Sequence, residues 1–194
     1  MDVARHAFAA RGYDGVRTQD IAAAAGISEA LIYQHFASKR ELYEEVIRQS
    51  AAALGDRLSE ATSAIPKKER LDRGLEAFVE FVADRSSGWS LLVSRVSDPD
   101  LLAYQRDTHR ACIRSLTALF AAERGGSRDG GEERQLEQLA EALAGGAEAL
   151  ATWWSEHPRA PRADGVSMLV DFAKRGLESS GSGGAKRSAA RRSR

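Results

Sequence analysis

Few residues of the chain have the types and spacing that metal binding or catalysis requires. The four histidines lie far apart in the sequence: His6, His35, His109 and His157. His109 and Cys112 form the only close pair of metal-ligand types, and two ligands do not complete a zinc site. The glycines between 125 and 131 follow a predicted helix and not a strand, so they do not form a phosphate-binding loop. We expect no cofactor, no metal site and, without paired catalytic residues, no enzyme activity.

A second set of polar residues, between positions 18 and 39, suits DNA recognition. Residues 18–37 predict two short helices joined by a turn with Gly26 at its corner, which is the pattern of a helix-turn-helix. Ala22 is expected where the two helices cross. Four apolar residues are expected to pack the pair on the preceding helix: Ile21, Ile27, Ile32 and Phe36. The second short helix would present its N-terminal end to the major groove, which is wide enough to admit a helix.

Capping signals position these elements. Gly12 is expected to end a first helix, because glycine adopts positive φ without a Cβ penalty. Thr18 is the predicted N-cap of the second helix and Ser28 that of the third. Ser38 with Glu41 forms a capping box that opens a long fourth helix.

The remaining chain also predicts helices. Its apolar residues recur at spacings of three and four, and no run alternates as a strand would. Asp98 and Pro99 form an N-cap and first-turn pair. We therefore predict an all-α fold of about nine helices. A three-helix helix-turn-helix DNA-binding domain would occupy residues 1–45, a helical bundle residues 46–178, and a disordered, basic Gly/Ser tail residues 179–194.

Composition and charge limit the class of protein. Of the 194 residues, 43% are hydrophobic and 29% charged, which is typical of a packed globular chain. No apolar run approaches the ~20 residues that span a bilayer, and the N-terminus lacks the order of a signal peptide. The single cysteine favours a reducing compartment. We expect a cytoplasmic protein without a membrane partner.

The charge is unevenly distributed along the chain. The net charge is zero, but residues 179–194 hold five basic residues and no acid, so residues 1–178 carry a net charge of minus five. The tail is interpreted either as a solubilising end or as an electrostatic arm for nucleic acid. Residues 1–48 hold six basic and seven acidic residues, whereas phosphate binding usually requires a basic face.

Over about 45 residues the sequence closely resembles the tetracycline-repressor (TetR) family of transcriptional regulators. The residues that carry the resemblance are Phe8 to Tyr13, Ile21, Ala22, Ala25, Gly26, Ile27, Ser28, Tyr33, His35, Phe36, Ser38, Lys39 and Leu42. The rest of the chain is similar in length, helix count and the stretch 153–158 before a final helix. The resemblance implies a homodimer that binds a palindromic operator in double-stranded DNA, and we expect a repressor that a small-molecule effector releases.

The resemblance assigns nine residues to the DNA interface: Thr18, Gln19, Ser28, Glu29, Ala30, Leu31, Tyr33, His35 and Lys39. Glu29 would accept a hydrogen bond from a cytosine amine, and Ala30 or Leu31 would contact a thymine methyl. The charge of Lys39 opposes the dipole of the fourth helix, and a bound phosphate would reconcile the two. The alternative for Tyr33 is an ordinary half-buried aromatic, and for His35 a packing residue.

The second half of the chain contributes two further expectations by resemblance. The eighth and ninth helices would pair with their copies across a two-fold axis. The stripe along the eighth helix supports such an interface or, alternatively, an intrachain core: Leu136, Leu139, Leu143, Ala147, Leu150 and Trp154. A small-molecule cavity, with His109 or Gln105 as polar anchors, would be lined by Phe78, Phe81, Trp89, Leu92, Tyr104, His109, Cys112, Leu116 and Trp153. Each lining residue is alternatively plain core.

Two other classes of function stay open at this point. A helical small-molecule-binding or interaction protein would keep the fold without binding DNA, and the acidic balance of residues 1–48 favours it. An all-helical enzyme is the weaker rival, since the sequence shows no paired catalytic residues.

Overall fold

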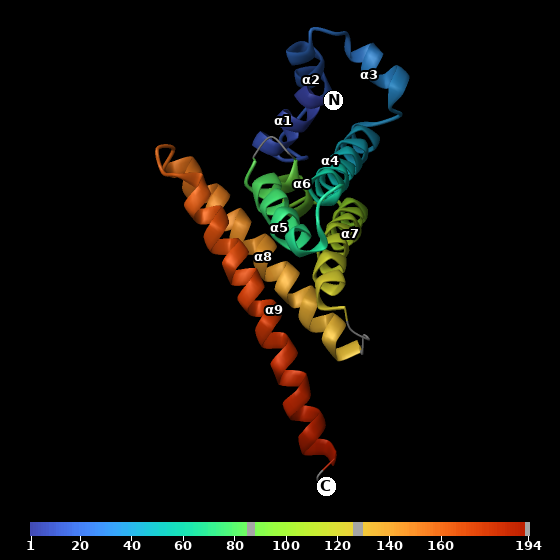
Figure 1. Ribbon diagram of the computed structural model, residues 1–194. Helices are drawn as coiled ribbons and strands as arrows, with labels where there is room; N and C mark the ends of the chain where they lie inside the picture. The colour runs from blue at the N-terminus through green and yellow to red at the C-terminus, as the bar shows by residue number, and fades with distance from the viewer. Residues whose placement is uncertain (85–87, 126–129, 193–194) are drawn as a thin grey trace. The chain divides into compact units, whose positions relative to one another are not determined.

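The computed structural model describes residues 1–84, 88–125 and 130–192, with side chains described as far as residue 179. Within these ranges the chain forms α-helices and no strand, which confirms the predicted all-α class. The nine helices are α1 (Asp2–Arg11), α2 (Thr18–Ala25), α3 (Glu29–His35), α4 (Lys39–Thr62), α5 (Lys67–Ala83), α6 (Trp89–Val93), α7 (Pro99–Arg124), α8 (Gly130–Glu156) and α9 (Arg162–Arg192) (Figure 1). No helix in the described ranges is long and apolar enough to cross a membrane.

Three helix starts follow from side-chain caps. Ser28 Oγ accepts a hydrogen bond from the Leu31 amide at 3.2 Å, as predicted for the start of α3. Asp98 Oδ1 accepts the amides of residues 100 and 101 at the start of α7. The Ser38 hydroxyl accepts the Glu41 amide, but the Glu41 carboxylate accepts the amide of Ala37 instead of that of Ser38. In this capping box, the bond from the Glu41 carboxylate back to the chain is therefore made one residue earlier than usual.

The predicted cap of α2 is wrong. Thr18 is the first residue of the helix, and the N-cap position is occupied by Arg17, whose backbone is extended and whose side chain makes no capping bond. The reason is tertiary, because the Thr18 hydroxyl is buried against α3. Helix α2 therefore begins without a side-chain acceptor for its first amides.

The first compact unit comprises residues 1–56 and 84–112. Its core contains Phe8 of α1, Ile21 and Ile32 of the helix pair, and Tyr43 of α4, all buried. Ile27, predicted to join them, is 41% exposed. Gly26 adopts a left-handed conformation and the Ile27 amide bonds back to the Ala22 carbonyl, so the residue after the turn faces outward.

Helices α1, α4 and α6 meet within this unit at Gly88, which has φ +85°. A Cβ at this position would collide with the Ser50 side chain of α4, and Arg5 of α1 lies 3.0 Å from the same point. Only glycine combines this backbone conformation with such a close approach. The unit therefore contains α6 and the first half of α7 as well as the helix-turn-helix, and the domain boundary at residue 45 stays a prediction.

The second compact unit comprises residues 57–83 and 113–194, with α5, α8 and α9 as its main elements. Helices α8 and α9 lie antiparallel (Figure 1) and approach closely at glycines. A Cβ on Gly176 would lie 2.5 Å from the Leu139 side chain, and one on Gly165 would lie 2.6 Å from the Trp154 ring. Lys174 of α9 pairs with Asp72 of α5 at 2.8 Å, which raises the pKa of that lysine.

The predicted tail falls mostly within α9, whose backbone continues to Arg192. Side chains from residue 180 onward, including the five basic ones, lie outside the described residues. Whether the tail acts as a solubilising end or as a nucleic-acid arm stays a prediction.

Two glycine substitutions test this packing. Gly165→Ala should destabilise the protein by about 1–2 kcal/mol net, because overpacking against the rigid, buried indole of Trp154 outweighs the gain in helix propensity. Gly55→Ala is the matched control, since nothing lies within 4 Å of its added Cβ, and it should stabilise α4 by up to about 1 kcal/mol. Urea unfolding followed by circular dichroism measures both; a stabilised Gly165→Ala protein would contradict the packing.

Candidate nucleic-acid interface

The outer face of α3 is a short, uncharged and exposed helical surface. Ile32 is 6% exposed and anchors the helix to the core of the first unit. Residues two positions away on either side, Ala30 and Gln34, therefore face outward, and both are exposed. Leu31 and Tyr33 flank them with exposed fractions of 38% and 49%. This face is available to a large partner such as a nucleic-acid groove.

Thr18 connects α2 to α3 and is buried. Its hydroxyl donates to Glu29 Oε1 at 2.5 Å and lies 3.1 Å from the Tyr33 hydroxyl. Only 6% of Thr18 is exposed. The Glu29 carboxylate is therefore turned back onto α2 instead of outward along α3. The sequence predicts Thr18 and Glu29 at the DNA interface, and the structure joins their side chains in a hydrogen bond between the two helices. Their contact with DNA stays a prediction.

Lys39 lies at the first position of α4, as expected, but its ammonium faces the protein. Its Nζ donates to the carbonyl oxygens of Tyr13 at 2.9 Å and Val16 at 3.0 Å, and lies 4.2 Å from the centre of the Tyr13 ring. Two carbonyl dipoles and an aromatic face thus offset the unfavourable position of a cation at a helix N-terminus. This contact ties α4 to the loop between α1 and α2.

The remaining predicted residues surround the exposed face. Gln19, Ser28 and His35 are exposed, and Ser28 also caps α3. Sequence reasoning missed Gln34, although its position two residues after buried Ile32 was a usable signal. It also missed Arg17, an exposed cation at the N-cap of α2 with no capping bond.

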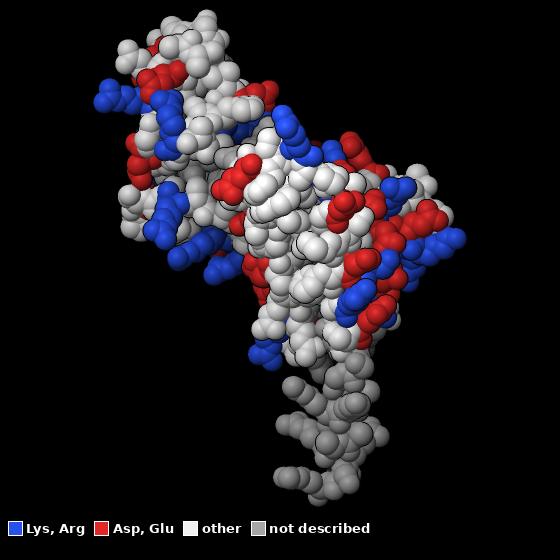
Figure 2. All heavy atoms as spheres, turned by 90° about the vertical axis from the view of Figure 1, so that its left-hand side faces the viewer, with Lys and Arg blue, Asp and Glu red and all other residues white. Residues whose placement is uncertain are grey.

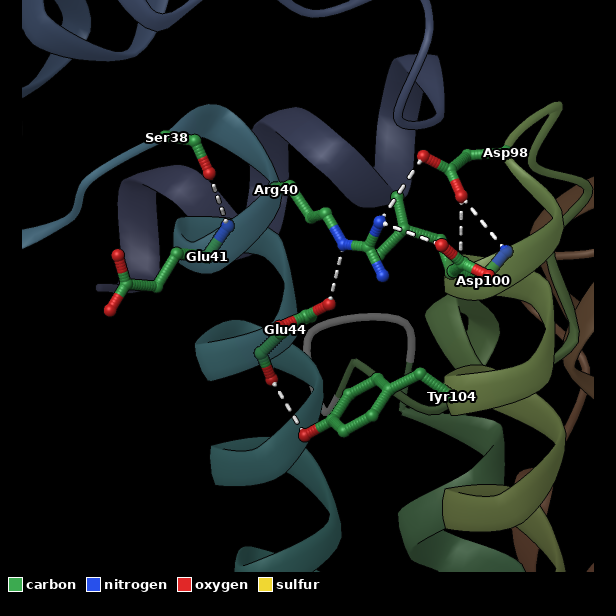
Figure 3. Close-up of polar contacts among 8 residues, drawn as sticks. Ser38, Arg40, Glu41, Glu44, Asp98, Asp100 and Tyr104 are labelled. Carbon is green, nitrogen blue, oxygen red and sulfur yellow. Dashed lines mark hydrogen bonds and ion pairs between the residues drawn. The ribbon is translucent and has the colours of Figure 1, made fainter.

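Helix α4 is fixed to α7 by an ionic cluster around Arg40 (Figure 3). Its guanidinium lies 2.9 Å from Glu44 Oε1 and 3.4 Å from Asp100 Oδ2, with Asp98 at 3.6 Å. One turn further along α7, the Tyr104 hydroxyl donates to the Glu44 carbonyl at 3.2 Å. Arg40 is therefore engaged within the unit, although sequence reasoning had no basis for pairing residues 60 positions apart.

An aromatic cluster links the same helix to α1. The Tyr43 ring of α4 lies 4.9 Å from Phe8, edge to face, and 5.0 Å from Tyr13. Burial raises the pKa of the Tyr13 hydroxyl, and the nearby Asp98 carboxylate raises it further. Burial likewise raises the pKa of Tyr43, so both hydroxyls stay protonated at neutral pH. The helix-turn-helix is thus held to α4 by aromatic packing as well as by Lys39.

The residues predicted to line an effector cavity divide between the two units. The first unit contains Trp89, Leu92, Tyr104, His109 and Cys112, and the second contains Phe78, Phe81, Leu116 and Trp153. All are buried or half-buried except Trp153. Within the first unit the rings of Trp89 and His109 lie 5.3 Å apart. The cavity itself stays a prediction.

Trp153 is 44% exposed and stacks on His157 at 4.2 Å. The adjacent Trp154 is 3% exposed, because α8 turns it towards α9. Trp153 therefore lies on the surface of the second unit and not in its core, where a cavity lining would place it.

One exposed face of α8 and α9 is apolar. Four residues of the stripe that begins at Leu136 are buried within the chain, namely Leu136, Leu143, Ala147 and Trp154, while Leu139 and Leu150 are half-buried. This burial favours the alternative of an intrachain core for the stripe. The exposed face instead contains Gly145, Ala149 and Trp153 on α8, with Met168 and Phe172 on α9. Met168 is 58% and Phe172 49% exposed. Figure 2 shows this side of the molecule, where uncharged side chains cover much of the surface above the grey segment.

No group of three His, Cys, Asp or Glu side chains could hold a metal ion within the ranges that the structure describes. In the first unit, α2 and α4 hold the short, exposed helix α3 in place. An exposed helix of this kind is suited to the major groove of DNA.

Comparisons with known proteins agree with this geometry. Residues 1–46 match the model for bacterial regulatory proteins of the tetR family, and residues 67–176 match a tetracyclin repressor-like C-terminal domain. The transcriptional activator FasR of Mycolicibacterium smegmatis is 30% identical over 90% of this chain and 79% of its own length.

Solved structures share the fold. A TetR-like regulator from Rhodococcus sp. RHA1 has 25% identity and a TM-score of 0.68, covering 91% of this chain and 92% of that one. The regulator FadR from Bacillus subtilis, in complex with stearoyl-CoA, has 19% identity and a TM-score of 0.65, covering 91% and 93%. The alternative of a helical protein that does not bind DNA is therefore set aside. The chain belongs to the TetR family of DNA-binding transcriptional regulators.

Proposed function

We propose that this regulator binds a palindromic operator as a homodimer, inserts the outer face of α3 into the major groove, and changes its DNA affinity when a small molecule binds. The observation that supports this most directly is the exposed, uncharged face around Ala30 and Gln34, held rigidly by buried Ile32. A short helix of this kind needs such support, because it is too short to be stable alone.

Base contacts are assigned to the uncharged side chains of this face. Ala30 and Leu31 offer apolar contact to a thymine methyl, and Gln34 can form two hydrogen bonds with the major-groove edge of an adenine, at N6 and N7. Glu29 is excluded from this role in the proposal, since its carboxylate accepts the Thr18 hydroxyl.

Phosphate contacts are assigned to the N-terminal end of α2. Arg17 places a cation beside amides that no side chain caps, and exposed Gln19 lies in the same turn. Tyr33 and His35 are exposed on α3 and keep the phosphate role that the resemblance implies. Lys39 becomes a positioning residue, because its ammonium already satisfies two backbone carbonyls.

Dimerisation is assigned to the exposed apolar face of α8 and α9. Two half-sites lie about 34 Å apart on DNA, and reading both requires two copies of α3. Large exposed apolar side chains such as Met168 and Phe172 mark an interaction surface, and a second copy of the same face is self-complementary around a two-fold axis.

Ligand response and the sign of regulation complete the proposal. The Bacillus subtilis regulator FadR, which has the same fold, was solved in complex with stearoyl-CoA. This supports the proposal that a small molecule controls DNA binding here. We propose that the regulator represses transcription from its operator. The Mycolicibacterium smegmatis relative is named as an activator, so a reporter gene placed behind the operator decides this point: deletion of the regulator should raise expression, and a fall would overturn repression.

Operator binding and base recognition can be tested together. Fluorescence anisotropy with duplexes from the DNA flanking the coding region should reveal a palindromic site bound far more tightly than scrambled DNA at the same salt concentration. Gln34→Ala should cost about 1–3 kcal/mol per half-site on that operator and almost nothing on scrambled DNA. Gln138→Ala, an exposed glutamine on α8, is the control. Equal affinity of the wild-type protein for all duplexes would refute sequence-specific binding.

The different roles of Lys39 and Arg17 predict different salt dependences. Arg17→Ala should weaken binding to every sequence and reduce the slope of log affinity against log salt by about one per half-site. Lys39→Met should lower the thermal midpoint and weaken binding, but leave that slope unchanged, because no counterion is released at this residue. A flatter slope for Lys39→Met would instead make Lys39 a phosphate ligand in the complex.

A charge placed on the apolar face should separate the dimer. Phe172→Asp is expected to convert a dimer into monomers in analytical ultracentrifugation and to abolish operator binding at concentrations where the wild-type protein saturates it. Ala103→Asp, an equal charge change at an exposed position of α7, should leave both properties intact. A Phe172→Asp protein that remains dimeric would place the interface elsewhere.

A further inference from the structure

The core of the first unit contains an amide that is only half satisfied. Gln105 lies on α7 and is 1% exposed. Its nitrogen Nε2 lies 3.0 Å from Tyr43 Oη, 2.5 Å from the Leu91 carbonyl oxygen and 3.1 Å from Ser94 Oγ. Its oxygen Oε1 is buried and has no hydrogen-bond partner among the described residues.

The orientation of the amide follows from its neighbours. A carbonyl oxygen such as that of Leu91 accepts hydrogen bonds and cannot donate, so the nitrogen of Gln105 must face it. Exchanging the two ends of the amide would bring two acceptor oxygens together and leave the nitrogen without an acceptor. The unpartnered atom is therefore the oxygen.

Every polar hydrogen in this network already has an acceptor. The two hydrogens of Nε2 bond Tyr43 Oη and the Leu91 carbonyl. The Tyr43 hydroxyl donates to Ser94 Oγ at 3.2 Å, and the Ser94 hydroxyl donates to the Leu91 carbonyl at 3.1 Å. The network has no donor left for Oε1. Buried acceptors in folded proteins nearly always have a partner, so the missing donor must come from outside these four residues.

We propose that Gln105 Oε1 accepts a hydrogen bond from the effector, and that the effector is an uncharged, largely apolar molecule carrying an O–H or N–H group. This inference rests on the proposed ligand-responsive function and specifies the chemistry that its ligand must have. An anionic head group fits poorly, because a carboxylate or phosphate would meet a lone acceptor where all local donors are already used. A cation finds no carboxylate among Tyr43, Leu91, Ser94 and Gln105.

The surroundings of the acceptor define the apolar part of the ligand. Leu101, one turn before Gln105 on α7, is fully buried, and so is Leu91 on α6. One turn after it, His109 lies 5.3 Å from the buried Trp89 ring. A hydroxyl or N–H group attached to an aromatic or aliphatic body matches an acceptor among mainly apolar and aromatic side chains.

Matched probes test the donor requirement on the full-length wild-type protein. Isothermal titration calorimetry compares 4-propylphenol with 4-propylanisole and 4-propylbenzoate, and 1-octanol with heptyl methyl ether and octanoate. In each trio the shape is similar while the end group donates, only accepts, or is anionic. We expect the phenol or the alcohol to bind at least tenfold more tightly than its two partners. An ether or carboxylate that binds as tightly, or no binding by either donor, overturns the inference.

Variants assign the effect to Gln105. In Gln105→Leu the phenol and the anisole should bind within about twofold of each other, since the acceptor is gone. Thr108→Val is the control, because that hydroxyl donates only to the Tyr104 carbonyl of its own helix, and it should keep the preference. If Gln105→Leu does not fold, the wild-type ranking still decides. A preference that survives in folded Gln105→Leu contradicts the assignment.

The occupant could also be a buried water molecule. A crystal structure with 4-propylphenol should place the phenol oxygen within hydrogen-bond distance of Oε1, and a water molecule that stays on Oε1 with the phenol bound elsewhere overturns the inference. DNA binding without a probe is a separate measurement: if it persists while the probes fail, this inference alone falls.

Discussion

The contact between the Lys39 ammonium and the loop after α1 is the constraint on which the DNA-binding unit depends. Helix α3 is seven residues long and α2 eight, so neither would form alone. Lys39 bonds two carbonyls of the loop that precedes α2 and starts α4 immediately after α3. It therefore closes the chain around both short helices, and the Thr18–Glu29 bond sets the angle between them.

The sequence was sufficient for what depends on local chemistry. Ser28, Ser38 and Asp98 cap the helices where their hydroxyl or carboxylate can reach nearby amides, and these bonds span two or three residues. Helical periodicity likewise identified the apolar stripe that begins at Leu136, but not whether it is core or interface. The helix-turn-helix was likewise predicted from residues 18–37, and the family match over residues 1–46 supports it.

Contacts between distant positions could not be obtained in this way. Thr18 looks like a cap because threonine commonly is one, but Glu29, eleven residues later, takes its hydroxyl. Lys39 looks like a phosphate ligand until the fold brings Tyr13 and Val16 beneath it. Periodicity also does not tell which face of an amphipathic helix is core and which is interface, since both are apolar; on α8 the stronger stripe is core and the exposed face adds a tryptophan next to a buried one.

A buried polar network costs free energy of folding when one of its members lacks a hydrogen-bond partner. The position of the network around Gln105 in the fold is therefore informative. Tyr43 belongs both to the network around Gln105 and to the aromatic cluster with Phe8 and Tyr13. Tyr13 in turn contributes the ring and one carbonyl that hold Lys39. The unpartnered oxygen of Gln105 is therefore connected, through two aromatic residues, to the contact that closes the DNA-binding unit. A donor bound at Gln105 changes the hydrogen bonding of the amide group, whose nitrogen donates to the Tyr43 hydroxyl. Any displacement of Tyr43 then acts directly on the loop that fixes α2 and α3. Affinity for the ligand and affinity for DNA are then coupled to the extent that this cluster differs between the two bound states, which is the condition that thermodynamic linkage sets.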